Sequence, residues 1–330
     1  MANSILHATF LADTTQQEVC MAAGRPILVT GSHRSGSTWT GKMLAFSPHV
    51  LYLQEPFNEH YYNPGTCRAY FDIPFCYVTE DNEQKYLVDL QRTVSLKYNW
   101  RESLAHTHGL KNYLRIGLEG FSFLRHRLTG GRPLFKDPFA LLSTEWLVNR
   151  FNMQPVILIR HPAAFTSSVK RFNWESPVHL LLQQNLLMRD YLEPLRQDIE
   201  AFLSQPRSIV EQAAQFWKML YFVVDIFRHR HPEWYFVRHE DLSANPKEEF
   251  RKIFAYLNLP YTTDIVNQIQ DYTNAKNPKF SQERTTVVKL NSQANIWSWK
   301  KRLTPEEVAR IREIAGEMAA KFGYDDEMWG

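Results

Sequence analysis

Short apolar runs alternate with longer stretches of helical periodicity along most of the chain. Five runs predict buried strands, because each is short, mostly apolar and bounded by glycine, proline or polar residues. They are 26–30, 50–54, 132–136, 155–160 and 233–238. The main helical patterns are 36–46, 141–151, 162–172 and 209–230. This alternation predicts an α/β fold, a three-layer α/β/α arrangement with a central, mostly parallel sheet.

Two later helices carry complete start signals. Segments 245–248 and 304–307 each begin with a polar cap residue, Asn245 or Thr304. A proline follows in the first helical turn and a glutamate at the third helical position. This combination is typical of a helix N-terminus.

Residues 60–130 and 173–207 do not follow the strand–helix alternation. We expect them to be insertions over one edge of the sheet, placed where they could cover a substrate. Neither a repeat nor a Pro/Gly/Ser linker divides the chain. The sequence therefore predicts one domain, 1–330.

The composition mainly argues against certain partners and sites. The chain has 38 basic and 35 acidic residues, so a net charge of +3 gives no reason to expect a nucleic-acid partner. Residues 1–24 lack a basic start and a sustained apolar core, and no window is long and apolar enough to span a membrane, which predicts a cytoplasmic protein. Cys20, Cys67 and Cys76 form no CxxC pair and no metal-ligand spacing, so we expect reduced thiols and no metal.

A glycine-framed loop follows the first predicted strand. Gly31 and Gly36 enclose four residues before a helix begins, and backbone N–H groups at such a turn bind anions. ATP and GTP hydrolases place lysine after the second glycine, but here Ser37 and then Thr38 follow. The missing lysine argues against magnesium-assisted phosphoryl transfer. A P-loop kinase or NTPase and a non-catalytic nucleotide-binding protein stay as alternatives.

The segment 34–39 resembles the phosphate loop of sulfotransferases that use 3′-phosphoadenosine-5′-phosphosulfate (PAPS). It reads Arg34, Ser35, Gly36, Ser37, Thr38, Trp39, and the arginine is similar to the carbohydrate, tyrosyl-protein and bacterial branches. The resemblance implies that Arg34 and the backbone of 35–38, within a region spanning 26–60, hold the 5′-phosphosulfate. It also implies that Trp39 stacks on adenine. His33 lies inside the loop and is included among the donor-binding residues.

A second match lies in 132–172. Arg160 ends the clearest strand, at the carboxyl edge where ligands bind in open α/β sheets, and its guanidinium can hold a phosphate with two N–H groups. Ser168 follows about two helical turns later. The resemblance implies that Arg160 and Ser168 bind the 3′-phosphate, which distinguishes PAPS from ATP.

The remaining similarity lies towards the C-terminus. In 284–325, Lys300, Lys301 and Arg302 resemble the family's basic loop before its last helix and are expected at the 3′-phosphate. The family's Arg-Lys-Gly form is absent, so a solvated basic run is an equal alternative. Glu240 and Asp241 are expected to stabilise a turn rather than to act in chemistry.

Sulfuryl transfer needs a group that takes the acceptor's proton. Lys136 matches the family's K-x-H segment, but the histidine is missing. Two carboxylates are candidates, Glu55 and Asp137, and we prefer Glu55, with Lys136 stabilising charge on the transferring group or the leaving phosphate. The expected reaction is in-line transfer from PAPS to a hydroxyl, or as second choice an amine, of a carbohydrate, lipid or natural product. The oligomeric state is left open.

Overall fold

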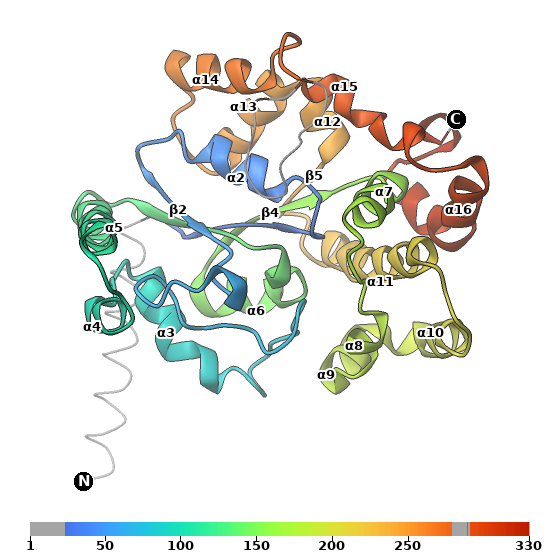
Figure 1. The fold of residues 1–330 in the computed structure, drawn as a ribbon, viewed down its shortest axis with the longest axis horizontal. Coiled ribbons are helices and arrows are strands. Elements are labelled where there is room, and N and C mark those ends of the chain that lie inside the picture. The colour runs from blue at the N-terminus through green and yellow to red at the C-terminus, as the bar shows by residue number, and fades with distance from the viewer. Residues whose placement is uncertain (1–23, 279–288, 290, 330) are drawn as a thin grey trace.

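The core of the protein is a sheet of five parallel strands in the order β2-β3-β1-β4-β5 (Figure 1). The computed structural model describes residues 24–278, 289 and 291–329. The strands are β1 Ile27–Gly31, β2 Val50–Gln54, β3 Arg132–Lys136, β4 Gln154–Ile159 and β5 Tyr235–Arg238. The predicted α/β class and all five predicted strands are confirmed, although the fifth begins two residues later than predicted.

β1 lies in the middle of the sheet, paired with β3 on one side and β4 on the other. All its residues are buried. Alternate side chains point to opposite faces, so Ile27 and Val29 belong to one hydrophobic cluster and Leu28 to another. A parallel strand buried on both faces explains why 26–30 is an unbroken apolar run.

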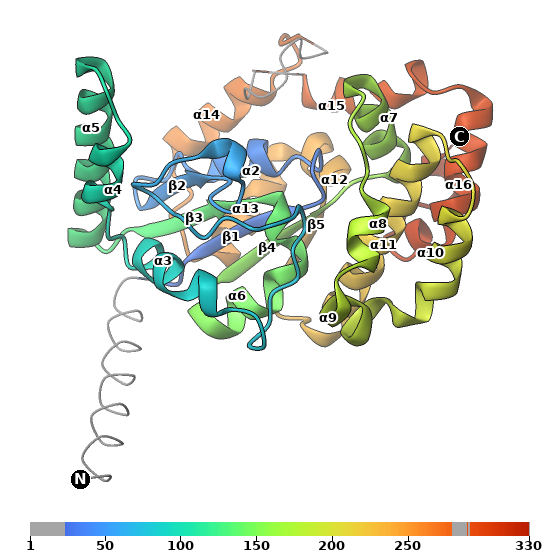
Figure 2. The same ribbon diagram turned by 60° about the horizontal axis from the view of Figure 1, so that its bottom comes forward.

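Helices cover both faces of the sheet, as Figures 1 and 2 show. One face is covered by α2 Ser37–Leu44, α12 His239–Ala244, α13 Pro246–Tyr256 and α14 Thr263–Thr273. The other is covered by α3 Gln84–Val94, α6 Thr144–Phe151, α7 Pro162–Phe172 and α11 Ile209–Arg230. Two further helices, α15 Ser292–Ile296 and α16 Pro305–Ala320, follow α14 in the chain, and α16 packs along α11. The three-layer prediction is therefore correct.

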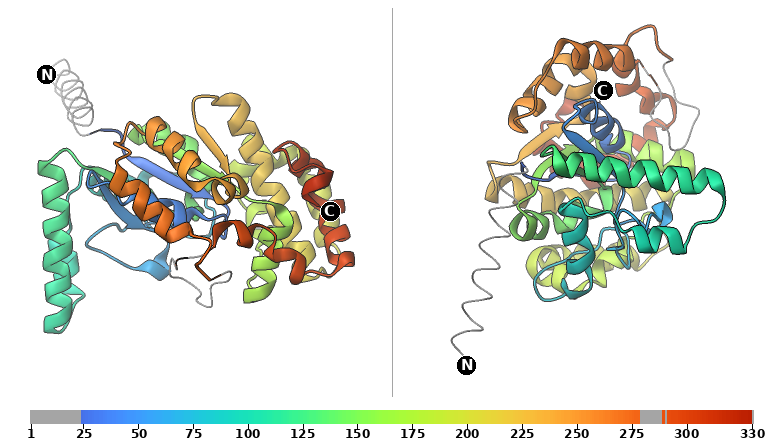
Figure 3. Two further views of the ribbon diagram at one scale, coloured as in Figure 1. Left: turned by 90° about the horizontal axis from the view of Figure 1, so that it is seen from above. Right: turned by 90° about the vertical axis from the view of Figure 1, so that its left-hand side faces the viewer.

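The two predicted insertions are largely helical. Between β2 and β3, residues 60–130 contain α3, α4 Trp100–Ala105 and α5 Leu110–Leu128 at the β2 edge of the sheet (Figure 3). Between α7 and α11, residues 173–207 contain α8 Val178–Leu182, α9 Asn185–Leu187 and α10 Arg196–Leu203. Both insertions contribute residues to the cavity described below.

Both predicted helix starts are confirmed, one of them with its capping hydrogen bonds. Thr304 accepts a hydrogen bond from the N–H of Glu307, and the Glu307 carboxylate accepts one from the N–H of Thr304. The second helix also begins where predicted, with Asn245 as the N-cap residue of α13 and Pro246 in its first turn, but the Asn245 side chain makes no capping hydrogen bond. Asn245 also ends the preceding helix α12, and its N–H donates to the carbonyl of Asp241.

The thiols of Cys67 and Cys76 are free and buried, as predicted, and Cys20 lies outside the described residues. Within 24–278 and 291–329, no helix combines the length and apolar character needed to cross a bilayer. The cytoplasmic location stays a prediction.

Candidate active site

The two sequence motifs meet at the carboxyl edge of the sheet. β1 and β4 are neighbours, with Gly31 opposite Leu158. The chain continues from β1 to β2 on one side of the sheet and from β4 to β5 on the other. Strands whose connections leave in opposite directions open a crevice between their carboxyl ends, where ligands of open α/β sheets bind. The loop after β1 and Arg160 after β4 both lie there.

The loop between β1 and α2 depends on its glycines. Gly36 has φ of 98°, a left-handed conformation, and begins α2 as its N-cap. A Cβ on Gly36 would lie 2.4 Å from Nδ1 of His239, and one on Gly31 would lie 2.5 Å from the carbonyl oxygen of Leu158. Arg34 also has positive φ, 64°. The loop is therefore held in a strained, tightly packed form, which is a feature of functional turns.

We expect Gly36→Ala to disrupt this loop. Strain at positive φ and the contact with His239 should lower the free energy of unfolding by about 1–3 kcal/mol and displace the N–H groups of α2. Thermal unfolding and calorimetric titration with an adenosine bisphosphate measure both effects. Gly316→Ala in the interior of α16, where the added Cβ meets only the flexible Arg312 side chain, should leave nucleotide binding unchanged and raise stability by up to about 1 kcal/mol, because alanine is the better helix former. Wild-type stability and wild-type nucleotide affinity in Gly36→Ala would contradict this prediction.

Arg34 and Arg160 hold the two motifs together. Nε of Arg34 donates to Oγ of Ser168 at 2.9 Å, and Nη1 of Arg160 donates to the carbonyl oxygen of Arg34. The Arg34 guanidinium also lies 4.6 Å from the ring centre of Phe172 and 5.4 Å from that of Trp174. Three residues predicted to bind the donor, Arg34, Arg160 and Ser168, thus form one connected group.

Positive charge is concentrated at this point. Burial, together with repulsion from Arg160, Arg171 and Arg302, lowers the pKa of Arg34 to about 10. Burial also lowers the pKa of Arg160, although the nearby Glu240 opposes the shift. Nε of Arg160 is buried without a hydrogen-bond partner among the described residues. A buried cluster of cations with an unused donor fits an anionic group such as a phosphate.

Glu240 lies beside this cluster and links two distant parts of the chain to it. Its carboxylate accepts from the N–H of His161 at 3.1 Å and from the hydroxyl of Tyr324 at 2.7 Å. Asp241 pairs with Arg238. Both acidic residues lie in the first turn of α12 rather than in a turn without helix, so that detail of the prediction is wrong.

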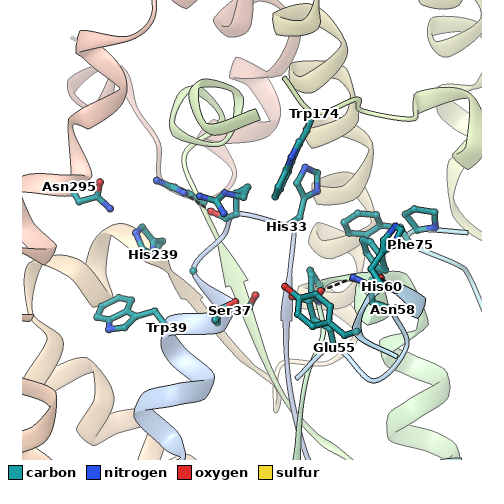
Figure 4. A pocket seen from close by; sticks show the side chains of 18 of the residues that line it. His33, Ser37, Trp39, Glu55, Asn58, His60, Phe75, Trp174, His239 and Asn295 are labelled. Carbon is teal, nitrogen blue, oxygen red and sulfur yellow. Dashed lines mark hydrogen bonds between the residues drawn. The ribbon is translucent and has the colours of Figure 1, made fainter. Parts of the chain in front are cut away.

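A single cavity of about 990 Å³ joins these residues to the predicted base (Figure 4). Trp39, His239 and Asn295 lie on one side, which we call the α2 side. Glu55, Asn58, His60 and Phe75 lie on the other, the Glu55 side, with Ser37 between the two. Further apolar lining residues are Pro74, Pro138, Phe139, Trp174, Pro177 and Leu180. Its volume is at the upper end of the ~300–1,000 Å³ that is usual for small-molecule sites.

Glu55 is held at the cavity wall from two directions. It follows β2, and its N–H donates to the carbonyl of Lys136 at 2.7 Å. One carboxylate oxygen pairs with Nζ of Lys136 and the other accepts from Asn58 at 2.8 Å. Its φ of 46° is unusual for glutamate and turns the side chain away from the line of the strand. Lys136 is fully buried and is not among the lining residues, so in this structure its charge acts on Glu55.

Asp137, the second candidate base, has a different environment. One carboxylate oxygen accepts from the N–H of Phe57 at 2.8 Å and the other from the N–H of Phe139 at 2.9 Å. Burial raises the pKa of Asp137 to about 7, and the charge of Glu55 adds to the shift. Because both oxygens are engaged and the residue does not line the cavity, the geometry favours Glu55 over Asp137.

His33 lies among aromatic rings at the centre of the cavity wall. Its ring is 4.9 Å from that of Phe165 and 5.9 Å from that of Trp174. Burial, together with Arg34, lowers the pKa of His33 to about 3, so the ring is neutral at physiological pH. A neutral ring can contact a donor through one nitrogen but adds no charge to the site.

Lys300, Lys301 and Arg302 lie in and after a short 3-10 turn before α16. Nζ of Lys300 is 4.6 Å from the ring centre of Trp297. None of the three is among the cavity-lining residues in the described part of the chain. Arg302 nevertheless lies close enough to the arginine cluster to interact with it. Burial lowers the pKa of Arg302, and repulsion from Arg171 and Arg160 adds to the shift. Their binding of the 3′-phosphate stays a prediction.

Sequence reasoning missed most of the α2 side. His239 lies against Gly36, its ring centre is 5.7 Å from that of Trp39, and burial lowers its pKa well below the usual value. Tyr272 and Thr273 of α14 and Ser292 and Asn295 of α15 also line the cavity. Only the residue following the fifth strand, His239, could have been suspected, because it occupies a strand end like Arg160.

No group of three or more metal-binding side chains is found among the residues that the structure describes. The assignment of the site therefore depends on its anion-binding groups and its carboxylate.

Comparison with known proteins places the chain in a family. The family model described as "Sulfotransferase family" matches residues 26–264. "Carbohydrate sulfotransferase 4" of Mus musculus is 20% identical over 327 residues, 90% of this chain and 81% of that protein. "Carbohydrate sulfotransferase 1" of Mus musculus is 30% identical over 88 residues, 27% of this chain and 21% of that protein. The solved "Sulfotransferase Domain from the Curacin Biosynthetic Pathway" is 14% identical with a TM-score of 0.47, covering 90% of this chain and 98% of that chain. Because the family match covers well over half of the chain, the protein belongs to the sulfotransferase family.

Proposed function

We propose that the protein transfers a sulfuryl group from PAPS to a hydroxyl group of a small acceptor, with Glu55 as the base. The observation that carries this proposal is the arrangement of one cavity, with the Arg34–Arg160 cluster and Glu55 on its wall. Family membership supports sulfuryl transfer as the reaction. The choice of donor and the role of each residue rest on the geometry.

The α2 side and the arginine cluster suit PAPS as the donor substrate. When bound, PAPS supplies a sulfuryl group joined to a phosphate that serves as the leaving group. Arg34 and the N–H groups of Gly36, Ser37 and Thr38 would hold the 5′ end, since loop and helix start form an anion site. The N–H of Ser35 donates to the carbonyl oxygen of Ser32 at 3.1 Å and shapes the loop instead. Arg160, whose Nε has no partner among the described residues, would hold the 3′-phosphate. The rings of Trp39 and His239 offer surfaces on which the adenine ring could stack.

Glu55 would act on the acceptor. Lys136 and Asn58 orient its carboxylate at the cavity wall. In this position Glu55 takes the hydroxyl proton as the acceptor oxygen bonds to sulfur and the bond between sulfur and the 5′-phosphate oxygen breaks. Arg34 and the loop N–H groups stabilise the charge that develops on that phosphate. No metal is needed in this scheme, because arginine and backbone dipoles balance the charge.

The Glu55 side favours an acceptor with an apolar or ring face. Phe75, Phe139, Trp174 and Leu180 line it, with Asn58 and His60 as hydrogen-bonding groups. Aromatic walls bind sugar rings, alkyl chains and planar natural products alike. The relatives are named for carbohydrate acceptors. We therefore propose a hydroxyl-bearing carbohydrate, lipid or natural product.

Ligand-dependent stabilisation tests the donor. 3′-Phosphoadenosine-5′-phosphate (PAP), the nucleotide product, should raise the unfolding temperature, because a ligand at about 100 times its Kd adds about 2.7 kcal/mol of stability. ATP with magnesium should stabilise much less, because it lacks the 3′-phosphate and Ser37 replaces the P-loop lysine. Stabilisation by ATP alone would instead indicate a P-loop kinase or NTPase. Stabilisation by PAP without turnover of any acceptor class would indicate a non-catalytic binding protein.

A further inference from the structure

The outward face of α5 carries an apolar stripe that the described part of the chain does not cover. Six large side chains on it are between 49% and 77% exposed: Leu110, Leu114, Leu118, Phe121, Leu124 and Leu128. Tyr113 beside them is 44% exposed. Large apolar side chains gathered on one exposed face mark an interaction site, whereas single exposed ones are normal. In Figure 3, α5 lies along one edge of the molecule, with its outer side directed away from the sheet.

The spacing of this stripe is that of a coiled-coil seam. From Leu110, positions 114, 117, 121, 124 and 128 follow at alternating intervals of four and three residues. This is the spacing of the a and d positions that pack against another helix. A helix that lies on a lipid surface needs a broad apolar face, but its apolar residues need not alternate at intervals of four and three. The opposite face of α5, with Ile116, Gly120 and Phe123, is buried against the protein itself.

The seam is also complementary to itself. Its positions are symmetric about 119, so that Leu110 corresponds to Leu128, Leu114 to Leu124 and Gly117 to Phe121. Gly117 leaves a notch, since a Cβ there would meet nothing within 4 Å. In an antiparallel pair of α5 helices, leucines face leucines and each Phe121 enters the notch at Gly117 of the other copy. A surface that matches itself in this way is what a two-fold interface requires.

We propose that a second copy of this chain covers the stripe, with α5 packed antiparallel against α5 in a two-fold dimer. Seven large apolar side chains along the 19 residues of α5 give such a pair a continuous apolar contact. The flanking charges oppose the pairing only weakly: Lys111, Arg115, Arg125 and Arg127 are exposed, and interactions between exposed charges are small and screened by salt. The dimer should therefore tighten as ionic strength rises.

Sedimentation velocity and light scattering on the full chain test the dimer. The wild-type protein should have twice the 38.9 kDa mass of one chain. Phe121→Glu, on the seam, and Leu118→Glu, directly beside it, should each raise the dimer dissociation constant by at least ~30-fold, as expected for side chains buried within an interface. Val88→Glu, at an equally exposed position on α3, is the matched control and should stay dimeric. Equal stabilisation of all variants by PAP shows that each is folded.

Disulfide cross-linking tests the orientation. With Cys20 replaced by serine and the native Cys67 and Cys76 buried, the double change Leu114→Cys and Leu124→Cys should yield a covalent dimer under mild oxidation. Each single change should not, because position 114 of one copy faces position 124 of the other. Cross-linking by Leu114→Cys alone would indicate a parallel pair and overturn the proposal.

Other occupants of the stripe give different results. A wild-type monomer at micromolar and higher concentrations overturns the dimer. If that monomer floats with phosphatidylserine vesicles and is released by added salt, the occupant is an anionic membrane, since salt weakens that attraction. If removing residues 1–23 converts the monomer to a dimer, that segment of the chain covers the stripe.

Discussion

Glu55→Gln should lower the turnover number by about 10²–10⁴, the usual contribution of a positioned general base. The amide cannot accept the proton of the acceptor hydroxyl, while its shape and its contact with Asn58 are nearly retained. Binding of PAP should change little, because the bound nucleotide contacts the other side of the cavity. Single-turnover sulfation with PAPS and calorimetry with PAP separate the two effects. The Tm should also fall, since the buried ammonium of Lys136 loses its ionic partner.

Two further variants make this result specific. Glu59→Gln changes an exposed carboxylate four residues away and outside the cavity, so turnover should stay within about threefold of wild type, an effect of less than 1 kcal/mol. Asp137→Asn should mainly lower stability, because an amide offers only one acceptor oxygen to the N–H groups of Phe57 and Phe139. If Glu55→Gln retains full turnover while Asp137→Asn abolishes it in a folded protein, the base is Asp137.

Arg160→Ala should raise the Kd of PAP by about 10- to 100-fold, corresponding to the roughly 1.5–3 kcal/mol of a charge-assisted hydrogen bond. The change removes the buried unpaired Nε and the bond from Nη1 to the carbonyl of Arg34. It therefore weakens both the predicted 3′-phosphate contact and the loop that follows β1. Calorimetric titration with PAP measures the loss, and the same titration with adenosine 5′-phosphosulfate, which lacks the 3′-phosphate, shows whether the lost contact is to that group.

Arg160→Lys is the matched comparison. It retains the positive charge near Glu240 but not the planar fork of donors, so its Kd should fall between those of wild type and Arg160→Ala. Arg251→Ala, an exposed arginine on α13, should not change the Kd. If Arg160→Ala binds PAP as tightly as wild type, the 3′-phosphate contact lies elsewhere, and Lys300, Lys301 and Arg302 become the next residues to replace.

The strands and the anion loop could be predicted because their signals are local. A buried parallel strand such as β4 requires an unbroken apolar run, and the turn after β1 requires glycine at Gly31 and Gly36. The strand-end position of Arg160 follows from the same pattern. The helix start at Asn245 was also predicted from a local signal and is confirmed, but Asn245 makes no side-chain cap bond and is also the end residue of the preceding helix α12.

The candidate site could be predicted only in part. Arg34 and Ser168 were expected at the same ligand, and the structure joins them by a hydrogen bond. His239 offered only its place after the fifth strand, and the positions of Tyr272 and Asn295 in the same cavity had no signal. They come from helices far along the chain, and α14 and α15 carry no motif that indicates which of their side chains face a ligand.

The sequence by itself determined the parallel sheet, the glycine loop and the arginine at the strand end, because apolar periodicity and positive-φ turns restrict local residue choice. Only the tertiary structure distinguishes the surroundings of the two carboxylates. Glu55 and Asp137 are both acidic residues after a strand, but β2–β3 pairing places Glu55 at the cavity beside Lys136, whereas Asp137 is engaged by two backbone N–H groups. The glycine loop, which lacks the P-loop lysine, is likewise contacted by two residues from distant segments. Arg160, after β4, donates to the carbonyl oxygen of Arg34, and His239, at the start of α12, packs against Gly36. Such contacts depend on how distant segments pack, which no local pattern specifies.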